Sequence, residues 1–191
     1  MTYIMNKSKS YIVGFCITLI FILIMLHHNS NSSSPALVYT QTYVDSLTYE
    51  IQLRDSLITD FKTYIPIGSP LDSTKINSKY GWRWGRMHQG VDLRGRYRDT
   101  VFSTAAGIVV EAGWSGGYGK RVKISHNNGY QTVYAHLSKI FVKKGEVVQD
   151  STAIGKVGNT GFSTGCHLHY EIIKDGEKIN PEDLLYKEID M

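Results

Sequence analysis

Four histidines and one aspartate between positions 88 and 169 of this 191-residue chain have types and spacings suited to metal binding and hydrolysis. His88 and Asp92 lie four apart in HQGVD, and His167 and His169 lie two apart in HLH. Alternate residues of an extended strand share a face, so each pair should point one way, unless Gly90 bends the first segment. Two imidazoles and a carboxylate are a common catalytic zinc set that leaves one position for water.

His136 ends a predicted strand and completes the five. The residues alone leave two arrangements open for the HLH pair: both imidazoles bind metal, or one binds and the other acts as a base. His126 borders a hairpin turn, where we expect a turn or capping role. No H-E-x-x-H sequence is present, which excludes the helical zinc-protease architecture.

The elements that must position these residues are short strands. Sixteen of the 18 glycines lie between Gly81 and Gly176, which indicates a turn-rich, mainly β domain. Segments 121–126 and 130–136 flank Asn128-Gly129, the strongest short hairpin signal. Alternation along the second arm puts Tyr130, Thr132, Tyr134 and His136 on one face. Further strands are predicted at 100–106, 107–112, 146–148, 153–157, 167–174 and 178–180, with a tight turn at Asp175-Gly176. The prediction is an antiparallel sheet, sandwich or partly closed barrel.

The N-terminal part predicts a membrane attachment. Residues 1–10 carry Lys7 and Lys9 and are expected to stay in the cytoplasm as an n-region. Residues 11–28, built on an uncharged apolar run, are expected to form an uncleaved transmembrane signal anchor rather than a cleaved signal peptide. The rest of the chain would then lie outside the membrane, on the periplasmic or cell-wall side.

Residues 29–65 are predicted to form a linker and a helical stalk. Apolar residues at 3- and 4-residue spacings predict a helix over 40–64, which Pro66 and Pro70 end. Two interpretations stay open: a stalk that forms a homodimer, or a helix packed on the surface of the domain.

Composition sets further limits. The chain has 21 Lys and Arg and 17 Asp and Glu, a net charge of +4, so we expect no nucleic acid among its partners, although an anionic polymer is compatible. Cys16 lies in the apolar run and Cys166 in the glycine-rich region, so no disulfide is expected.

The residues of the β domain resemble the M23 zinc metallopeptidases, the lysostaphin- and LytM-like cell-wall endopeptidases. The resemblance covers roughly residues 66–186, leaving 187–191 as a tail. The matching stretches are SKYGWR at 78–83, HQGVDL at 88–93, AAGIVVEA at 105–112, YG at 118–119, YQTVYAHL at 130–137, 143–148, 154–157, GNTGFSTGCHLHYE at 158–171 and NP at 180–181. The stretch between Arg83 and His88 is short, so a loop that covers the cleft in the family is expected to be missing.

The resemblance implies a LytM-type domain with one Zn²⁺ held by His88, Asp92 and His169. It also implies that His136 and His167 are catalytic, without saying which of them is the base. The implied activity is hydrolysis of peptide cross-links of bacterial peptidoglycan by a water activated on zinc. All five residues are present, which disfavours the alternative of a non-catalytic LytM-type module that regulates other wall hydrolases.

Two other features complete the expectations. Arginines at 83, 86, 94, 96 and 98 surround the first metal motif and could bind carboxylates of wall peptides, or simply form a solvated face.

A carrier barrel of the lipoyl or biotinyl type is rejected. That class needs an exposed lysine at the tip of a hairpin, whereas the one clear hairpin tip in this sequence is Asn128-Gly129.

Overall fold

The computed structural model describes residues 35–187. The predicted n-region, the anchor at 11–28, residues 29–34 of the linker and the end of the tail lie outside this range. The chain divides into two compact units, residues 1–53 and 54–191. The helix expected over 40–64 is present as α2 (Pro35–Thr63), which begins five residues earlier. Within the described range, no helix has both the length and the apolar composition needed to cross a membrane.

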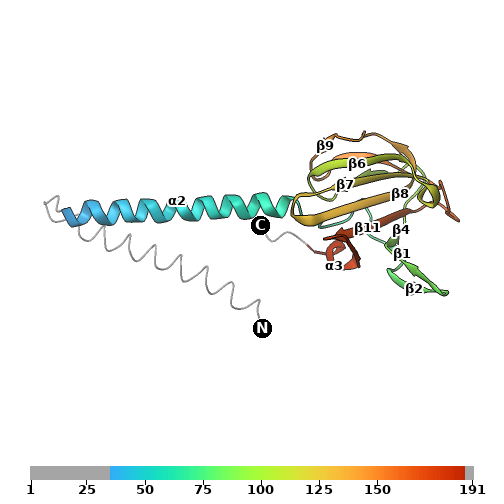
Figure 1. The fold of residues 1–191 in the computed structure, drawn as a ribbon, viewed down its shortest axis with the longest axis horizontal. Helices are drawn as coiled ribbons and strands as arrows, with labels where there is room; N and C mark the ends of the chain where they lie inside the picture. Colours follow the sequence, from blue (N-terminus) through green and yellow to red (C-terminus); the bar gives the residue numbers. More distant parts are fainter. Residues whose placement is uncertain (1–34, 188–191) are drawn as a thin grey trace. The chain divides into compact units, whose positions relative to one another are not determined.

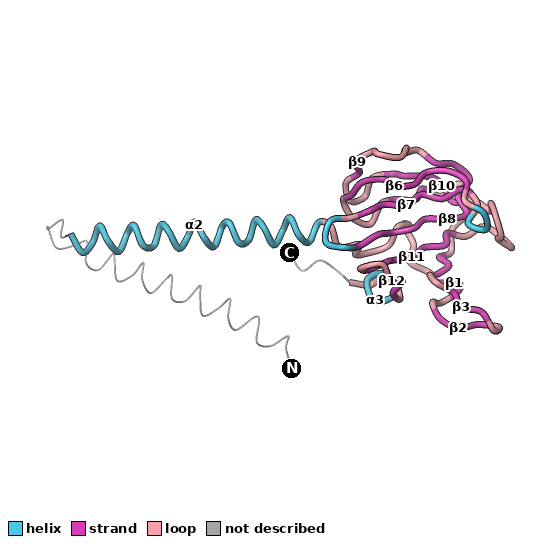
Figure 2. Tube along the Cα trace, in the orientation of Figure 1, coloured by secondary structure: helices cyan, strands magenta, loops and turns pink. Residues whose placement is uncertain are grey.

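The second unit is built on one ten-stranded sheet and one two-stranded sheet, and all pairs are antiparallel. The central path runs β1-β4-β11-β8-β7-β6-β9 (Figures 1 and 2). Strand β10 pairs with β5 and β8, β12 pairs with β11, and β2 and β3 form the small hairpin. The strands are β1 (Ile76–Ser78), β2 (Gly81–Arg83), β3 (Arg86–His88), β4 (Val91–Leu93), β5 (Thr100–Phe102), β6 (Gly107–Trp114), β7 (Lys120–Ser125), β8 (Tyr130–Ile140), β9 (Val147–Val148), β10 (Ala153–Val157), β11 (Leu168–Lys174) and β12 (Glu177–Ile179). Short helices are η1 (Gly116–Tyr118), η2 (Asn127–Gly129) and α3 (Glu182–Leu185).

The mainly β, antiparallel prediction is confirmed, and so are both hairpins marked by turn residues. β7 and β8 pair across the Asn128 turn, and β11 and β12 pair across Asp175-Gly176, whose φ angles are +50° and +89°. The strand predicted at 100–106 ends at Phe102 instead. The Ser103 hydroxyl donates to the Ala105 carbonyl at 2.7 Å, and this local turn stops the extended backbone.

The sheet separates a buried face from a face that carries the polar site. Tyr134 of β8 and Tyr170 of β11 are fully buried in the apolar core, with ring centroids 5.3 Å apart. Both hydroxyls reach Thr104 Oγ1, at 3.1 and 2.8 Å, so these buried polar groups are satisfied. By strand alternation, His169 and Ala135, which are paired across β11 and β8, point to the opposite face.

The prediction that His136 shares a face with Tyr134 is wrong. Three residues of β7, from Lys120 to Val122, are matched by four of β8, from Tyr134 to Leu137. One extra residue in one strand is a β-bulge, and His136 has a φ of +60° there. The bulge turns the imidazole from the core side to the face of His169, whose ring centroid is 5.8 Å away.

Candidate metal centre

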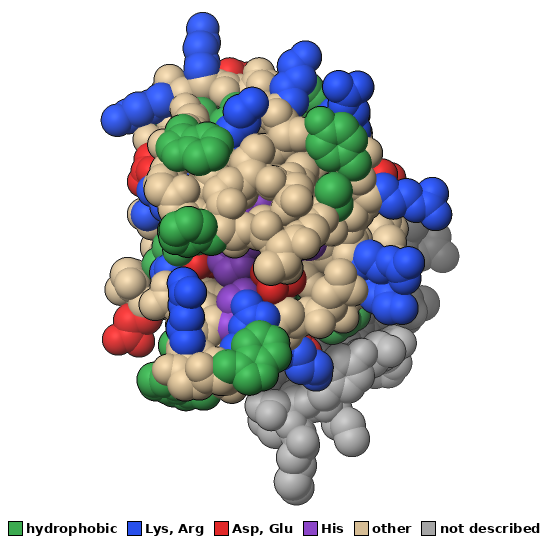
Figure 3. Space-filling model, turned by 90° about the vertical axis from the view of Figure 1, so that its right-hand side faces the viewer, with side chains coloured by type: hydrophobic (Ala, Val, Ile, Leu, Met, Phe, Trp, Pro, Cys, Tyr) green, Lys and Arg blue, Asp and Glu red, His purple; other side chains and the backbone are tan. Residues whose placement is uncertain are grey.

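A cleft of about 510 Å³ lies on the polar face of the second unit. Figure 3 shows a hollow with histidine side chains at its bottom and hydrophobic and basic side chains around it. Its walls come from the β2–β3 hairpin on one side and from the loops around Tyr118 and Phe162 on the other. All five residues selected from the sequence line this cleft: His88, Asp92, His136, His167 and His169.

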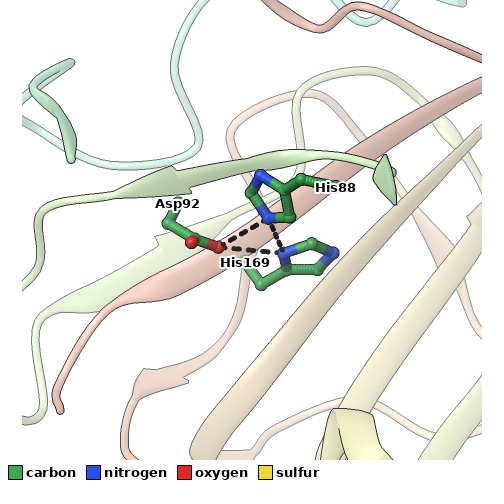
Figure 4. Close-up of side chains that lie close together, drawn as sticks. All are labelled: His88, Asp92 and His169. Atoms are coloured by element: carbon green, nitrogen blue, oxygen red, sulfur yellow. Dashed lines mark hydrogen bonds and ion pairs between the residues drawn. The ribbon is translucent and has the colours of Figure 1, made fainter. Parts of the chain in front are cut away.

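Three of them form a tight cluster at the bottom (Figure 4). His88 Nε2 lies 3.1 Å from Asp92 Oδ1, His169 Nδ1 lies 3.0 Å from the same oxygen, and the two nitrogens are 3.1 Å apart. Asp92 and His169 are directly opposite each other in the β4–β11 pair, so the sheet register itself brings these ligands together.

His88 reaches the cluster because the chain bends between β3 and β4. The predicted extended HQGVD segment is divided between two strands of different sheets, with Gly90 at the bend. A Cβ on Gly90 would lie 2.4 Å from the Tyr170 carbonyl oxygen of β11. Only glycine lets the backbone pass that close, which explains why it stands between the two ligands.

The hydrogen-bond partners of the rings determine which nitrogens face the cluster. A carbonyl oxygen only accepts, so the 2.8 Å contact between His88 Nδ1 and the Lys79 oxygen requires a proton on Nδ1 and leaves a lone pair on Nε2. His169 Nε2 lies 3.1 Å from the Glu171 carboxylate, which leaves the lone pair on Nδ1. Two facing lone pairs and a carboxylate oxygen are a donor set for a cation.

The spacing of this donor set fits zinc. Ligands about 2.0–2.1 Å from a tetrahedral ion are separated by roughly 3.3 Å, close to the three distances observed. Burial raises the pKa of Asp92, but the close contacts with the imidazoles of His169 and His88 outweigh burial and hold the pKa well below its ordinary value. Asp92 is therefore ionised at neutral pH and offers a negative charge to the ion.

His136 and His167 lie beside the cluster. Their ring centroids are 4.8 Å apart, and His167 Nε2 is 3.5 Å from Asp92 Oδ1. His136 Nδ1 donates to the Thr160 oxygen at 2.8 Å, and His167 Nδ1 donates to the Gly165 oxygen at 2.9 Å. Each ring is thus fixed through its Nδ1, and Nε2 remains as the nitrogen that can transfer a proton.

Glu171 is the residue of the site that the sequence interpretation missed. Its side chain is buried, and its carboxylate accepts hydrogen bonds from Tyr118 Oη at 2.9 Å and Lys178 Nζ at 3.0 Å as well as from His169. Burial raises the pKa of Glu171, but the bonds from His169 and Lys178 outweigh it and lower the pKa. The period of two that pairs His167 with His169 continues to Glu171, so H-x-H-x-E was the available signal.

Comparison with known proteins agrees with this geometry. Residues 86–181 match Peptidase family M23, and this range contains all five cleft residues. The chain belongs to peptidase family M23.

Named relatives and solved structures share this M23 domain. The chain is 44% identical over 136 residues to the "Peptidoglycan DD-endopeptidase ShyA" of Vibrio cholerae, a match that covers 66% of this chain and 30% of ShyA. A "zinc containing peptidase" from Vibrio cholerae superposes with a TM-score of 0.58 at 31% identity, covering 64% of this chain and 40% of that one. The catalytic domain of lysostaphin from Staphylococcus simulans superposes with a TM-score of 0.55 at 34% identity, covering 60% of this chain and 93% of that domain. The chain therefore spans less than a third of ShyA but nearly a whole lysostaphin catalytic domain.

The other residues selected from the sequence lie outside the candidate metal centre or at its edge. His126 is buried and joins the Ala106 oxygen to Thr132 Oγ1, at 2.7 and 2.9 Å, so its role is structural, although its side chain makes no helix cap. Of the five arginines, only Arg83 and Arg86 line the cleft. Cys166 is a free, exposed thiol.

Replacing Glu171 should weaken metal binding without removing a metal ligand. Loss of an outer-shell partner of a ligating histidine costs about 10- to 100-fold in metal affinity or activity. Glu171→Gln keeps an oxygen acceptor for His169, so its zinc affinity should be reduced by about 10-fold. Glu171→Ala keeps no acceptor, so its zinc affinity should be reduced by about 100-fold. Zinc affinity, measured by competition with a chromogenic chelator, tests this.

The matched control is Glu111→Gln, which also removes a carboxylate from an ion pair, with Arg121, but outside the cleft. It should leave zinc affinity unchanged. Wild-type zinc affinity in Glu171→Ala would show that His169 needs no orienting carboxylate.

Proposed function

We propose that this chain is a zinc-dependent metalloendopeptidase that hydrolyses peptide cross-links of bacterial cell-wall peptidoglycan. The observation that carries the proposal is the convergence of five residues in one open cleft: three with a metal-binding arrangement and two histidines whose Nδ1 atoms are fixed by carbonyl oxygens. Membership of family M23 and the names of ShyA and the zinc-containing peptidase support the same chemistry.

His88, Asp92 and His169 would hold the ion. Bound zinc supplies a Lewis acid that polarises a carbonyl and lowers the pKa of water toward neutrality. Asp92 offsets one of its two positive charges, so the site stays cationic and favours an anionic transition state. Glu171 keeps His169 in the tautomer that directs Nδ1 at the ion.

The two remaining histidines carry out the proton transfers. Burial lowers the pKa of His136, an effect that the hydrogen bond to Thr160 only partly opposes, so its ring is neutral near pH 7. A neutral ring whose Nδ1 donates to a carbonyl can accept a proton at Nε2, which is the requirement for a general base. His167 faces the same space, and in its imidazolium form, with Nδ1–H still donating to Gly165, its Nε2–H would donate to the oxyanion or the leaving amine.

This assignment predicts a pH profile. A base must be deprotonated to act, so activity should rise with pH through the pKa of His136. Because that pKa is lowered from 6.5, half-maximal kcat/KM on the acid side should occur below pH 6.5. The profile is measured with zinc held in excess by a metal buffer, so that ligand protonation does not empty the site. An acid limb centred above pH 6.5 would contradict a neutral His136 base.

The alternative is a non-catalytic LytM-type module that binds the wall and regulates other hydrolases. Such a role would be favoured by a missing ligand or a missing proton-transfer group. His88, Asp92 and His169 form the cluster and His136 and His167 flank it, so the enzyme is the better proposal.

We also propose that residues 11–28 anchor the chain in the membrane with the M23 domain on the cell-wall side, where peptidoglycan lies. The support is the uncharged apolar run after Lys7 and Lys9.

Helix α2 is the candidate for homodimerisation, because it exposes Leu47 and Ile51, which lie four residues apart. Protease accessibility of the domain in intact spheroplasts and chemical cross-linking of the full-length chain test these two proposals.

The activity itself is tested on the full-length chain purified in mild detergent. Zinc is quantified, the protein is incubated with purified sacculi, and released peptides are identified by mass, with a chelator-treated control. Stoichiometric zinc and new chelator-sensitive peptide ends would establish the endopeptidase and identify the bond. Zinc without cleavage would favour the regulatory module, and absence of zinc binding would contradict the ligand set.

A further inference from the structure

The β2–β3 hairpin carries a tryptophan where the backbone disfavours one. Its turn consists of Trp84 and Gly85, with φ angles of +49° and +74°. Two-residue turns with both φ positive prefer Asn or Gly, and a bulky residue there is a conformational outlier. Strain of this kind persists at positions with a functional role.

The Trp84 side chain is also almost fully exposed. Its residue surface is 93% accessible, although a tryptophan gains more from burial than most side chains. Arg83 covers one side of the ring, with its guanidinium carbon 5.5 Å from the ring centroid. A second arginine, Arg86, follows the turn on the same wall. The hairpin tip therefore presents an aromatic surface and the Arg86 cation to solvent, whereas the Arg83 guanidinium is paired with Asp92 Oδ2 at 3.4 Å.

A second exposed ring lies on the other wall of the same cleft. Phe162 is 86% accessible, and its backbone N donates to the Gly117 oxygen at 2.8 Å. A Cβ on Gly117 would lie 3.0 Å from the Phe162 ring, so the ring rests on the bare backbone there. Trp84 and Phe162 thus border the metal cluster from opposite walls, both held by a local backbone feature.

We propose that Trp84 and Phe162 bind the glycan strand of peptidoglycan beside the cross-link that enters the cleft, an inference that rests on the proposed function. Indole and phenyl faces pack against the C–H faces of sugar rings, and arginines bind carboxylates of the peptide stems that branch from them. Aromatic rings and an exposed arginine at one rim match a polymer of sugar rings from which peptides with carboxylate groups branch.

The position of the rings favours this ligand over a lipid bilayer or a second copy of the chain. Both rings line the mouth of the cleft, and a bilayer or protein surface packed on them would cover the metal cluster. A glycan strand is narrow, and it is covalently linked to every peptide that reaches the cluster. It can occupy the rim while the cross-link occupies the bottom.

The test separates polymer binding from bond cleavage. Trp84→Asn removes the ring and supplies a residue that the turn prefers, so the variant should fold. Affinity for sacculi is measured by co-sedimentation of the zinc-loaded full-length chain carrying His136→Ala, with and without Trp84→Asn. The loss expected from removing one aromatic contact is roughly 10-fold. Trp114→Ala, an exposed tryptophan on β6 that does not line the cleft, is the matched control and should bind like the parent.

Cleavage is then compared on two substrates in the background with His136 intact. Trp84→Asn should reduce cleavage of sacculi about 10-fold more than cleavage of a glycan-free cross-linked peptide. Equal loss on both substrates, or Trp84-dependent binding to anionic lipid vesicles or to a second copy instead of sacculi, would overturn the inference. If the wild-type chain cleaves neither substrate but binds sacculi through Trp84, the proposed function fails while this inference stands.

Discussion

Replacing His136 with alanine should abolish peptide-bond hydrolysis and leave zinc bound. The side chain does not belong to the cluster of His88, Asp92 and His169, so its removal takes no ligand from the ion. Its Nε2 is the proton acceptor in the proposed mechanism, because Nδ1 is committed to the Thr160 oxygen at 2.8 Å. General-base catalysis contributes about 10²- to 10⁴-fold, and the fall in kcat should lie in that range.

The separation of the two effects is what identifies a catalytic role. Zinc content and zinc-dependent thermal stability of His136→Ala should equal those of the wild type, while the release of new peptide ends from sacculi stops. The bulge at His136 adds one concern, since its φ of +60° is disfavoured for alanine. Asparagine tolerates a positive φ but cannot act as a base, so His136→Asn should lose peptide-bond hydrolysis to the same extent as His136→Ala. Wild-type turnover in either variant would exclude His136 as the base.

The part of this site that the sequence predicted is the part that follows from short-range geometry. A strand period of two puts His167 and His169 on one face, and the structure brings both to the cleft. Turn residues at Asn128-Gly129 and Asp175-Gly176 fix two hairpins through the backbone angles that they permit. These features depend on residues that are neighbours in the chain.

What the sequence did not predict depends on pairing between strands. The face of His136 is set by one extra residue in β8 relative to β7, and a bulge has no signature in the alternation of β8 alone. Lys178 is paired with Ile173 across the predicted β11–β12 hairpin, so its contact with Glu171 is a diagonal one that the turn residues alone do not specify. The β2–β3 hairpin was missed for another reason: its turn carries Trp84, a residue that turn statistics would not place there.

Replacing Asp92 with asparagine should remove both zinc and activity. Asparagine has nearly the same shape but no charge, and its amide could turn an N–H₂ group toward His88 and His169. The ion would then face two neutral imidazoles without the carboxylate that offsets its charge. Loss of a ligand should cost more than the roughly 10- to 100-fold that an outer-shell substitution costs. Zinc should therefore dissociate on dilution, and no turnover should remain.

Thermal unfolding gives this prediction a readout that is independent of activity. A ligand that binds only the folded state stabilises it by about 4 kcal/mol at 1,000 times its Kd. For a domain of this size, that corresponds to a rise in Tm on the order of 10 °C. Wild type and His136→Ala should show the rise on adding zinc and lose it with a chelator, whereas Asp92→Asn should show neither change.

The contrast between the two variants distinguishes a ligand from a base in one experiment. Asp92 is paired with His169 across β4 and β11, so both side chains are positioned by the sheet whether or not metal is present. Asp92→Asn should therefore fold, with a Tm close to that of the chelator-treated wild type. Full zinc stoichiometry in Asp92→Asn would mean that two imidazoles suffice to hold the ion, and the role of Asp92 would then lie in orienting His88 and His169.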